Sequence, residues 1–210
     1  MLRIRPVIEH RPHLLEDFTA WPVEAGPLSP LDDDLVVLDG TLTPAQVGAV
    51  VALLAGYNHL RVEEDAGPLD ALLGEEPFRA SGGLLTEDSR TGLVMGPSCC
   101  SDLDGWRSWY EVGRSAEIPW TVHGTDAVLR LDGPSVRFVP LERAVGRAVT
   151  EVPLAELPSL LAGVERDLAA FLVLLGDWAR RTVPERAEEL VRAFGRSLRI
   201  PEEAEPWAAS

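Results

Sequence analysis

The chain has 210 residues, with 34 acidic and 19 basic side chains that give a net charge of −15. This charge argues against binding to nucleic acids, whose phosphates require a basic surface, and it favours a basic partner, although solubility alone also explains it. No apolar run reaches the roughly 18 residues of a membrane-spanning helix, and the N-terminus lacks a signal-peptide core. We therefore expect a cytoplasmic protein that folds as a single domain over 1–210 without a cofactor. The sequence leaves the oligomeric state open.

The N-terminal third predicts short strands and one helix. Residues 2–8 alternate apolar and basic side chains as a strand does, and residues 35–38 form the apolar run of a buried strand. Four prolines in residues 11–31 predict irregular structure there. Residues 44–55 predict a helix, because Thr43 can cap it, Pro44 suits its first position, Gln46 can close a capping box, and apolar side chains follow at helical spacing up to Gly56. Residues 57–62 predict another strand, but no glycine-rich loop for a nucleotide opens the helix.

The middle of the chain predicts hairpins. Residues 68–73 are expected to form one or two helical turns. Further along the chain, the polar residues 86–92 separate two short apolar runs, 84–85 and 93–94. Asp132-Gly133-Pro134-Ser135 is typical of a tight turn between two strands. The predicted strands are 84–85 paired with 93–94, 127–131 paired with 136–139, and a single strand at 149–152.

The C-terminal third predicts two helices. From residue 157 an apolar stripe recurs at helical period as far as Trp178, and a second stripe follows Pro184 up to residue 198. A short turn joins them, so an antiparallel pair is expected, whereas the acidic tail at 201–210 is expected to be loose. The fold class that we predict is α+β: a mainly antiparallel sheet, with the helix pair and one or two further helices packed on it.

The rare side chains of the chain gather between Met95 and Trp120. This segment holds both cysteines and three of the six tryptophans. Ser101 and Asp104 resemble a capping box, and in an α-helix that begins there Leu103, Trp106 and Tyr110 would share one face. One interpretation is an exposed aromatic patch with the composition of a binding hot spot. The other is a core element, with only Arg107 and Trp109 accessible. The candidate binding residues are Trp106, Arg107, Trp109, Tyr110 and Trp120.

The two cysteines are adjacent, which prevents an unstrained disulfide between them. A helix that begins just after Cys99 and Cys100 would lower the pKa of either thiol, so both are possible reactive thiols, with His59 or His123 as the base. Alternatively, both cysteines are small buried apolar residues. Neither the cysteines, the histidines nor the acidic runs at 32–34, 63–65 and 75–76 have the spacing of metal ligands, so no metal site and no catalytic residue is predicted.

The segment from Gly96 to Trp109, GPSCCSDLDGWRSW, resembles a group of uncharacterised actinobacterial proteins in which cysteines precede a Trp-Arg-x-Trp helix. All basic side chains are Arg, which also indicates a GC-rich genome of that kind. The resemblance covers roughly residues 93–200. More loosely, these proteins are similar to the SUKH superfamily of immunity-type domains, which bind and neutralise toxin domains. The resemblance implies an α+β fold and a protein partner, and it brings no catalytic residue.

These observations favour a non-enzymatic, acidic, cytoplasmic binding protein, as an immunity-type partner of a basic toxin domain. Two alternatives stay open. One is a small enzyme that uses Cys99 or Cys100 as its nucleophile. The other is a small-ligand binder whose pocket is lined by Trp106, Trp109 and Trp120.

Overall fold

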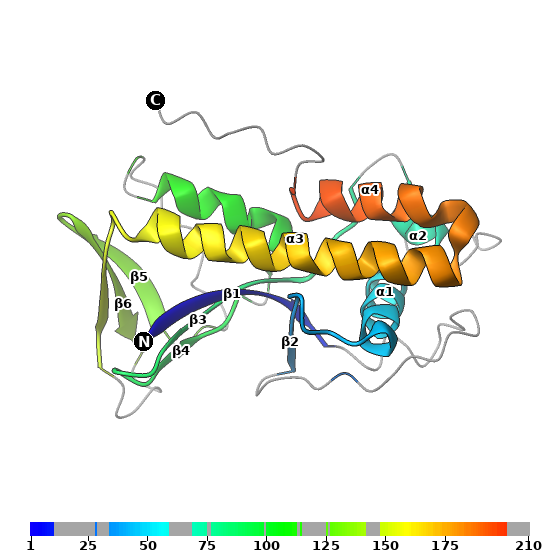
Figure 1. The fold of residues 1–210 in the computed structure, drawn as a ribbon. Helices are drawn as coiled ribbons and strands as arrows, with labels where there is room; N and C mark the ends of the chain where they lie inside the picture. Colours follow the sequence, from blue (N-terminus) through cyan, green and yellow to red (C-terminus); the bar gives the residue numbers. More distant parts are fainter. Residues whose placement is uncertain are drawn as a thin grey trace. The chain divides into compact units, whose positions relative to one another are not determined.

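A computed structural model describes residues 1–10, 28, 34–58, 69–74, 77–98, 100–112, 114, 125, 127–141 and 148–200 (Figure 1). The described residues form helices and two antiparallel sheets and end in a pair of helices, which confirms the predicted α+β class. The predicted irregular segment, apart from Leu28, and the predicted loose tail lie outside these ranges.

The chain forms two compact units. The long helix α3 (Leu157–Thr182) contributes its first part to one unit and the rest to the other. That the whole chain is a single domain stays a prediction. The first unit comprises Met1–His10, Pro30–Asp39 and Ser81–Asp167, and the second comprises Arg11–Ser29, Gly40–Ala80 and Leu168–Ser210.

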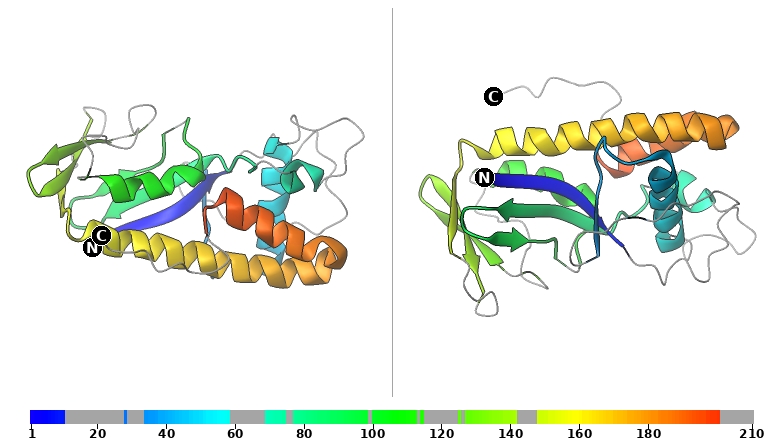
Figure 2. Two further views of the ribbon diagram at one scale, coloured as in Figure 1. Left: turned by 90° about the horizontal axis from the view of Figure 1, so that it is seen from above. Right: turned by 60° about the horizontal axis from the view of Figure 1, so that its bottom comes forward.

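The larger sheet of the first unit has the strand order β2-β1-β3-β4, and all its pairs are antiparallel. Strand β1 lies beside β3 along its whole length, from Leu2 opposite Asp88 to Ile8 opposite Gly82 (Figure 2). Val7, Leu35 and Leu85 form a buried apolar cluster on this sheet. Its strands are β1 (Leu2–Glu9), β2 (Leu35–Val37), β3 (Gly82–Asp88) and β4 (Leu93–Met95), as the apolar patterns predict.

The smaller sheet of the first unit is a three-stranded meander of β5 (Ala127–Asp132), β6 (Ser135–Pro140) and β7 (Thr150–Pro153). Gly133 has a φ of 55° in the turn between β5 and β6, a conformation that favours glycine. Val136 and Phe138 of β6 are fully buried. The predicted hairpin and the strand that follows it are therefore confirmed.

Four helices and one 3₁₀ turn supply the described structure of the second unit. Helix α1 (Pro44–Asn58) begins with the predicted capping box: Thr43 N donates to Gln46 Oε1 at 2.9 Å, and Gln46 N donates to Thr43 Oγ1 at 3.3 Å. Helix α4 (Ala187–Ser197) folds back along the second half of α3 (Figure 1), where the Phe171 and Phe194 rings lie 6.1 Å apart. The remaining elements are α2 (Asp70–Leu73) and η4 (Pro184–Arg186). No helix of the described ranges is long and apolar enough to cross a membrane.

Helix α1 is longer than predicted, because Asn58 anchors its last turn. The Asn58 side chain is buried; its Nδ2 donates to the carbonyls of Leu54 at 2.8 Å and Arg79 at 2.9 Å, and its Oδ1 accepts from Arg79 N at 2.9 Å. The prediction of a strand from Tyr57 is therefore wrong at Tyr57 and Asn58. The rest of that predicted strand, 59–62, lies outside the described residues.

Asp88 closes the turn that follows β3. Its side chain is fully buried, and its carboxylate accepts hydrogen bonds from the Nε, NH2 and backbone N of Arg90, each at 3.1 Å. These bonds hold the pKa of the Asp88 carboxyl well below its usual value. A carboxyl whose pKa is lower in the folded than in the unfolded chain stabilises the fold above the unfolded pKa and loses that effect as the pH falls.

We expect Asp88→Asn to lower the free energy of unfolding by about 1–3 kcal/mol at pH 7, because several hydrogen bonds to a buried charge are lost. The difference between wild type and variant shrinks progressively below about pH 4, where the unfolded carboxyl becomes protonated. Urea unfolding at several pH values measures it. Asp132→Asn, at an exposed carboxylate of β5, is the control with little effect. An equal loss at pH 7 and pH 3 would contradict the linkage.

Candidate functional site

The aromatic segment folds as a nine-residue 3₁₀ helix, η3 (Leu103–Glu111), rather than the predicted α-helix. In a 3₁₀ helix the side chains at i and i+3 eclipse one another. Leu103, Trp106 and Trp109 therefore share one face, and they are 0%, 1% and 6% exposed, whereas Tyr110 is half-buried. The prediction that Tyr110 faces the core and that Trp109 is accessible is corrected by this difference in helical period.

The start of η3 also differs from the prediction. The helix begins at Leu103 with Asp102 in the cap position, and no side chain caps it. Gly105 N donates to the carbonyl of Asp102 at 3.1 Å. The capping box expected from Ser101 and Asp104 therefore does not form, and both side chains border the space next to the helix instead.

Arg107 makes structural contacts within the first unit. Its guanidinium carbon lies 4.5 Å from the centre of the Trp106 ring, and its NH2 donates to Glu165 Oε1 of α3 at 2.8 Å. The Trp106 ring in turn lies 6.1 Å from that of Tyr110. Of the two interpretations of this segment, the described residues therefore agree with the core element and not with the exposed aromatic patch, because Trp106 and Trp109 are both buried. Trp120, the remaining predicted member, lies outside the described residues.

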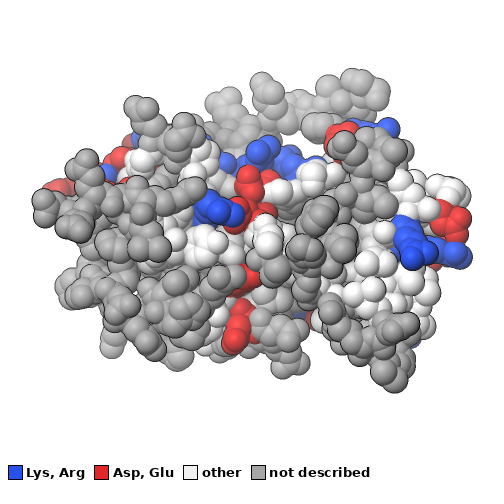
Figure 3. Space-filling model, turned by 180° about the vertical axis from the view of Figure 1, so that it is seen from behind, with Lys and Arg blue, Asp and Glu red and all other residues white. Residues whose placement is uncertain are grey.

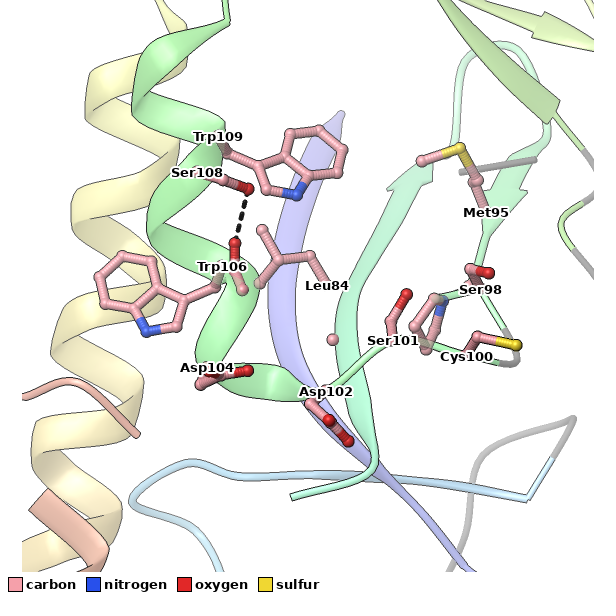
Figure 4. Close-up of a pocket in the computed structure, with 14 residues that line it drawn as sticks. Leu84, Met95, Ser98, Cys100, Ser101, Asp102, Asp104, Trp106, Ser108 and Trp109 are labelled. Carbon is pink, nitrogen blue, oxygen red and sulfur yellow. Dashed lines mark hydrogen bonds between the residues drawn. The ribbon is translucent and has the colours of Figure 1, made fainter. Parts of the chain in front are cut away.

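A pocket of about 470 Å³ lies beside η3 (Figure 4). Its walls come from β3, from the segment that links β4 to η3, and from η3 itself. Small-molecule sites in proteins have volumes of roughly 300–1,000 Å³, so its size suits a small ligand. The lining residues are Gly83, Leu84, Met95, Gly96, Pro97, Ser98, Cys100, Ser101, Asp102, Asp104, Gly105, Trp106, Ser108 and Trp109.

The charged side chains that line this pocket are two carboxylates, Asp102 and Asp104, and no basic side chain is among the described residues of its wall. Three serines add hydroxyl groups. Ser108 donates its hydroxyl to the Gly105 carbonyl at 2.7 Å (Figure 4). Ser98 is buried, and its hydroxyl has no hydrogen-bond partner in the described part of the chain. The charge of the described pocket wall is therefore negative, and apolar side chains such as Leu84 and Met95 form another part of that wall.

Gly83 lines the pocket at a position where a larger residue would not fit. Gly83 of β3 has a φ of 155°, and a Cβ atom there would lie 2.9 Å from the Cβ of Pro97. Any larger residue would displace Pro97, which belongs to the segment that carries Ser98 and Cys100 along the pocket wall. Between Gly96 and Trp109, small glycine and serine residues leave space for the pocket, and the buried apolar side chains of the same segment hold its wall in place.

Cys100 is exposed at the pocket, so the interpretation that it is a buried apolar residue is wrong. Cys99 lies outside the described residues, as do the two histidines considered as its base. In the described residues, no group of three or more His, Cys, Asp or Glu side chains could hold a metal ion.

Trp109 also borders a second cavity, of about 290 Å³. Leu157, Pro158 and Leu161 of α3 give it a mainly apolar wall. Its arginine, Arg114, lies 3.7 Å from Glu111 in an exposed ion pair, and such pairs contribute little. The first pocket is the stronger candidate site, because it combines a suitable volume with a single sign of charge.

No family model, curated protein or solved structure matches the chain. The resemblance to the actinobacterial group and to the SUKH superfamily therefore stays a prediction. Function has to be inferred from the geometry and charge of the pocket itself.

Proposed function

We propose that this protein is a non-enzymatic binding protein that takes a small cationic molecule in the pocket beside η3. The observation that carries the proposal is the sign of charge in that pocket: the charged side chains among its described lining residues are the carboxylates Asp102 and Asp104. The volume of about 470 Å³ and the net charge of −15 support it.

The chemistry of the wall suits an ammonium or guanidinium group. Carboxylates accept charge-assisted hydrogen bonds from such groups, and these bonds are shorter and stronger than neutral ones. The hydroxyl groups of Ser101 and Ser108, together with backbone carbonyls near Gly96 and Gly105, offer further acceptors. A concave site with one sign of charge also concentrates the counter-charged ligand. An anion would meet the same carboxylates and be repelled.

We expect butylguanidine and butylamine to bind the wild-type protein in isothermal titration calorimetry at low salt, while butyrate does not. Asp102→Asn with Asp104→Asn should weaken binding of the cations at least about tenfold, since each charge-assisted hydrogen bond contributes about 1.5–3 kcal/mol. Thermal melting verifies that the variant folds.

A matched control removes the same two charges elsewhere. Asp132→Asn with Asp177→Asn changes exposed carboxylates that pair with Arg137 and Arg180. This variant should bind the cations as the wild type does, apart from a small loss that salt abolishes. Equal weakening in both double variants would mean that only the overall charge matters, and the pocket would then not be the site.

A basic protein partner, in the manner of an immunity protein, is the second candidate. The net charge of −15 favours it, but the acidic runs at 63–65 and 75–76 lie outside the described residues. In the view from behind, the described charged side chains lie in small groups with blue and red atoms side by side (Figure 3). The test is gel filtration and affinity recovery from the native host. Recovery of the protein alone at low salt would contradict a basic partner.

A further inference from the structure

We infer that Ser98 is a ligand-binding residue of the pocket beside η3, and that the cationic ligand carries a hydroxyl group that forms a hydrogen bond with the Ser98 hydroxyl. This inference rests on the proposed function and names the ligand class more closely: a small amino alcohol, whose ammonium and alcohol groups are separate parts of the molecule. The observation behind it is one buried hydroxyl group that has no partner in the described fold.

The Ser98 hydroxyl is buried and unpaired. Ser98 is 2% exposed, and its Oγ atom has no hydrogen-bond partner among the described residues. Such a group is unfavourable for folding, because it has lost its hydrogen bonds to water without replacing them, and few occur in native proteins. Ser197 shows the usual arrangement: it is 1% exposed, and its Oγ accepts a hydrogen bond from Phe78 N at 3.0 Å. The Ser98 hydroxyl, by contrast, contributes no hydrogen bond to the described fold.

The backbone of Ser98 is held on the wall of the pocket. Its carbonyl accepts a hydrogen bond from Ser101 N at 2.9 Å, which closes a turn. Figure 4 shows Ser98 between Met95 and Cys100, two other residues of this wall. A serine side chain turns about a single bond between staggered positions. A polar group in the pocket can therefore draw the Ser98 hydroxyl towards itself without any movement of the backbone.

An alcohol is the ligand group that suits this position. The hydroxyl of serine has one donor and two acceptor lone pairs, and a second hydroxyl can pair with either kind of site. A charged group is disfavoured there, because Met95 on the same part of the wall is buried, and a charge beside buried apolar atoms loses the water that stabilises it. The ligand group at Ser98 is therefore neutral, and its ammonium group lies elsewhere in the pocket.

Linear amino alcohols of increasing length, with the hydroxyl at the end, provide the test. Each is compared with the alkylamine in which a methyl group replaces the hydroxyl. The alcohols are ethanolamine, aminopropanol, aminobutanol and aminopentanol, and the controls run from propylamine to hexylamine. In isothermal titration calorimetry with the wild-type protein, the alcohol that reaches Ser98 should bind about five- to tenfold more tightly than its alkylamine, the effect of one hydrogen bond to a buried group.

Ser98→Ala should bind the alkylamines as the wild type does and lose the preference for the alcohol. Two control variants remove other hydroxyls of the same wall. Ser108→Ala removes a hydroxyl that already donates to the Gly105 carbonyl at 2.7 Å, and Ser101→Ala removes one from the turn that holds Ser98. Both controls should keep the preference for the alcohol.

Thermal melting without ligand shows whether the Ser98 hydroxyl has a structural role instead. Ser98→Ala should melt at the temperature of the wild type or above it, since alanine removes an unpaired buried polar group. Ser197→Ala is the matched control, because it leaves Phe78 N without its partner, and it should melt at least about 2 °C below the wild type. A similar drop for Ser98→Ala would overturn the inference.

The outcomes separate the two proposals. Failure of every alkylamine and amino alcohol to bind the wild type would overturn the proposed function and this inference with it. If the amines bind but no alcohol is preferred, or if Ser98→Ala keeps the preference, the inference alone is overturned and the cationic pocket stands. Loss of the preference in Ser101→Ala or Ser108→Ala, with Ser98→Ala unchanged, would assign the hydrogen bond to another serine and overturn it as well.

Discussion

Gly82→Ala is expected to lower the free energy of unfolding by about 4 kcal/mol or more, or to prevent folding altogether. Gly82 begins β3 with a φ of 150°, a region that side chains rarely adopt. An added Cβ would lie 2.1 Å from the carbonyl oxygen of Val7 and 2.7 Å from the Cα of Ile8, both of them backbone atoms of β1. The clash would fall on the central strand pair of the larger sheet, where no flexible side chain can move aside.

The measurement is equilibrium unfolding in urea, or the soluble yield where the variant does not fold. Gly105→Ala is the control, since a Cβ at Gly105 meets nothing within 4 Å. Because alanine loses less backbone entropy than glycine on folding, this control should change stability by no more than about 1 kcal/mol. A Gly82→Ala protein as stable as the control would contradict the strand register.

Trp109→Ala should cost about 3–5 kcal/mol of unfolding free energy, the usual range for truncation of a buried tryptophan. Tyr110→Ala, at a half-buried residue, should cost only about 1 kcal/mol. The physical reason is the 3₁₀ period, which places Trp109 in line with Leu103 and Trp106 on the buried face. Urea unfolding followed by far-ultraviolet circular dichroism measures both variants under identical conditions.

The order of the two effects tests the helix type. An α-helix from the same residues would bury Tyr110 with Leu103 and Trp106 and would leave Trp109 at the edge of the stripe. A larger loss for Tyr110→Ala than for Trp109→Ala would therefore contradict the 3₁₀ geometry. It would also contradict the position of Trp109 in the pocket wall.

Much of the fold follows from periodicity. Alternation in residues 2–8, the turn at Asp132 to Ser135 and the long stripe of α3 each predict the observed element, because burial of one face dictates the spacing of apolar side chains. The end of α1 does not follow from it. Asn58 is the only asparagine of the chain, and its hydrogen bonds to Leu54 and Arg79 depend on a segment about twenty residues away, which local patterns do not show.

The candidate site was predicted in part. The segment that concentrates the cysteines and tryptophans does line the pocket, but its aromatic side chains were assigned an α-helical period and hence the wrong face. The sequence predicts Asp102 and Asp104 only as residues at the start of a helix, and not as binding residues. One signal bears on this segment: Gly105 within the helix weakens an α-helical interpretation. Gly83 and Leu84 come from another strand, and no spacing along the chain brings them to this wall.

Nuclear magnetic resonance of the wild-type protein during titration with butylguanidine tests the central claim most directly. Trp109→Phe identifies the indole N–H signal of Trp109 among the six tryptophans. We predict that this signal and the amides of Gly83, Gly96 and Gly105 shift together and saturate, since all four residues line the pocket. Saturable shifts confined to other residues, with these four signals unmoved, would contradict binding at the pocket beside η3.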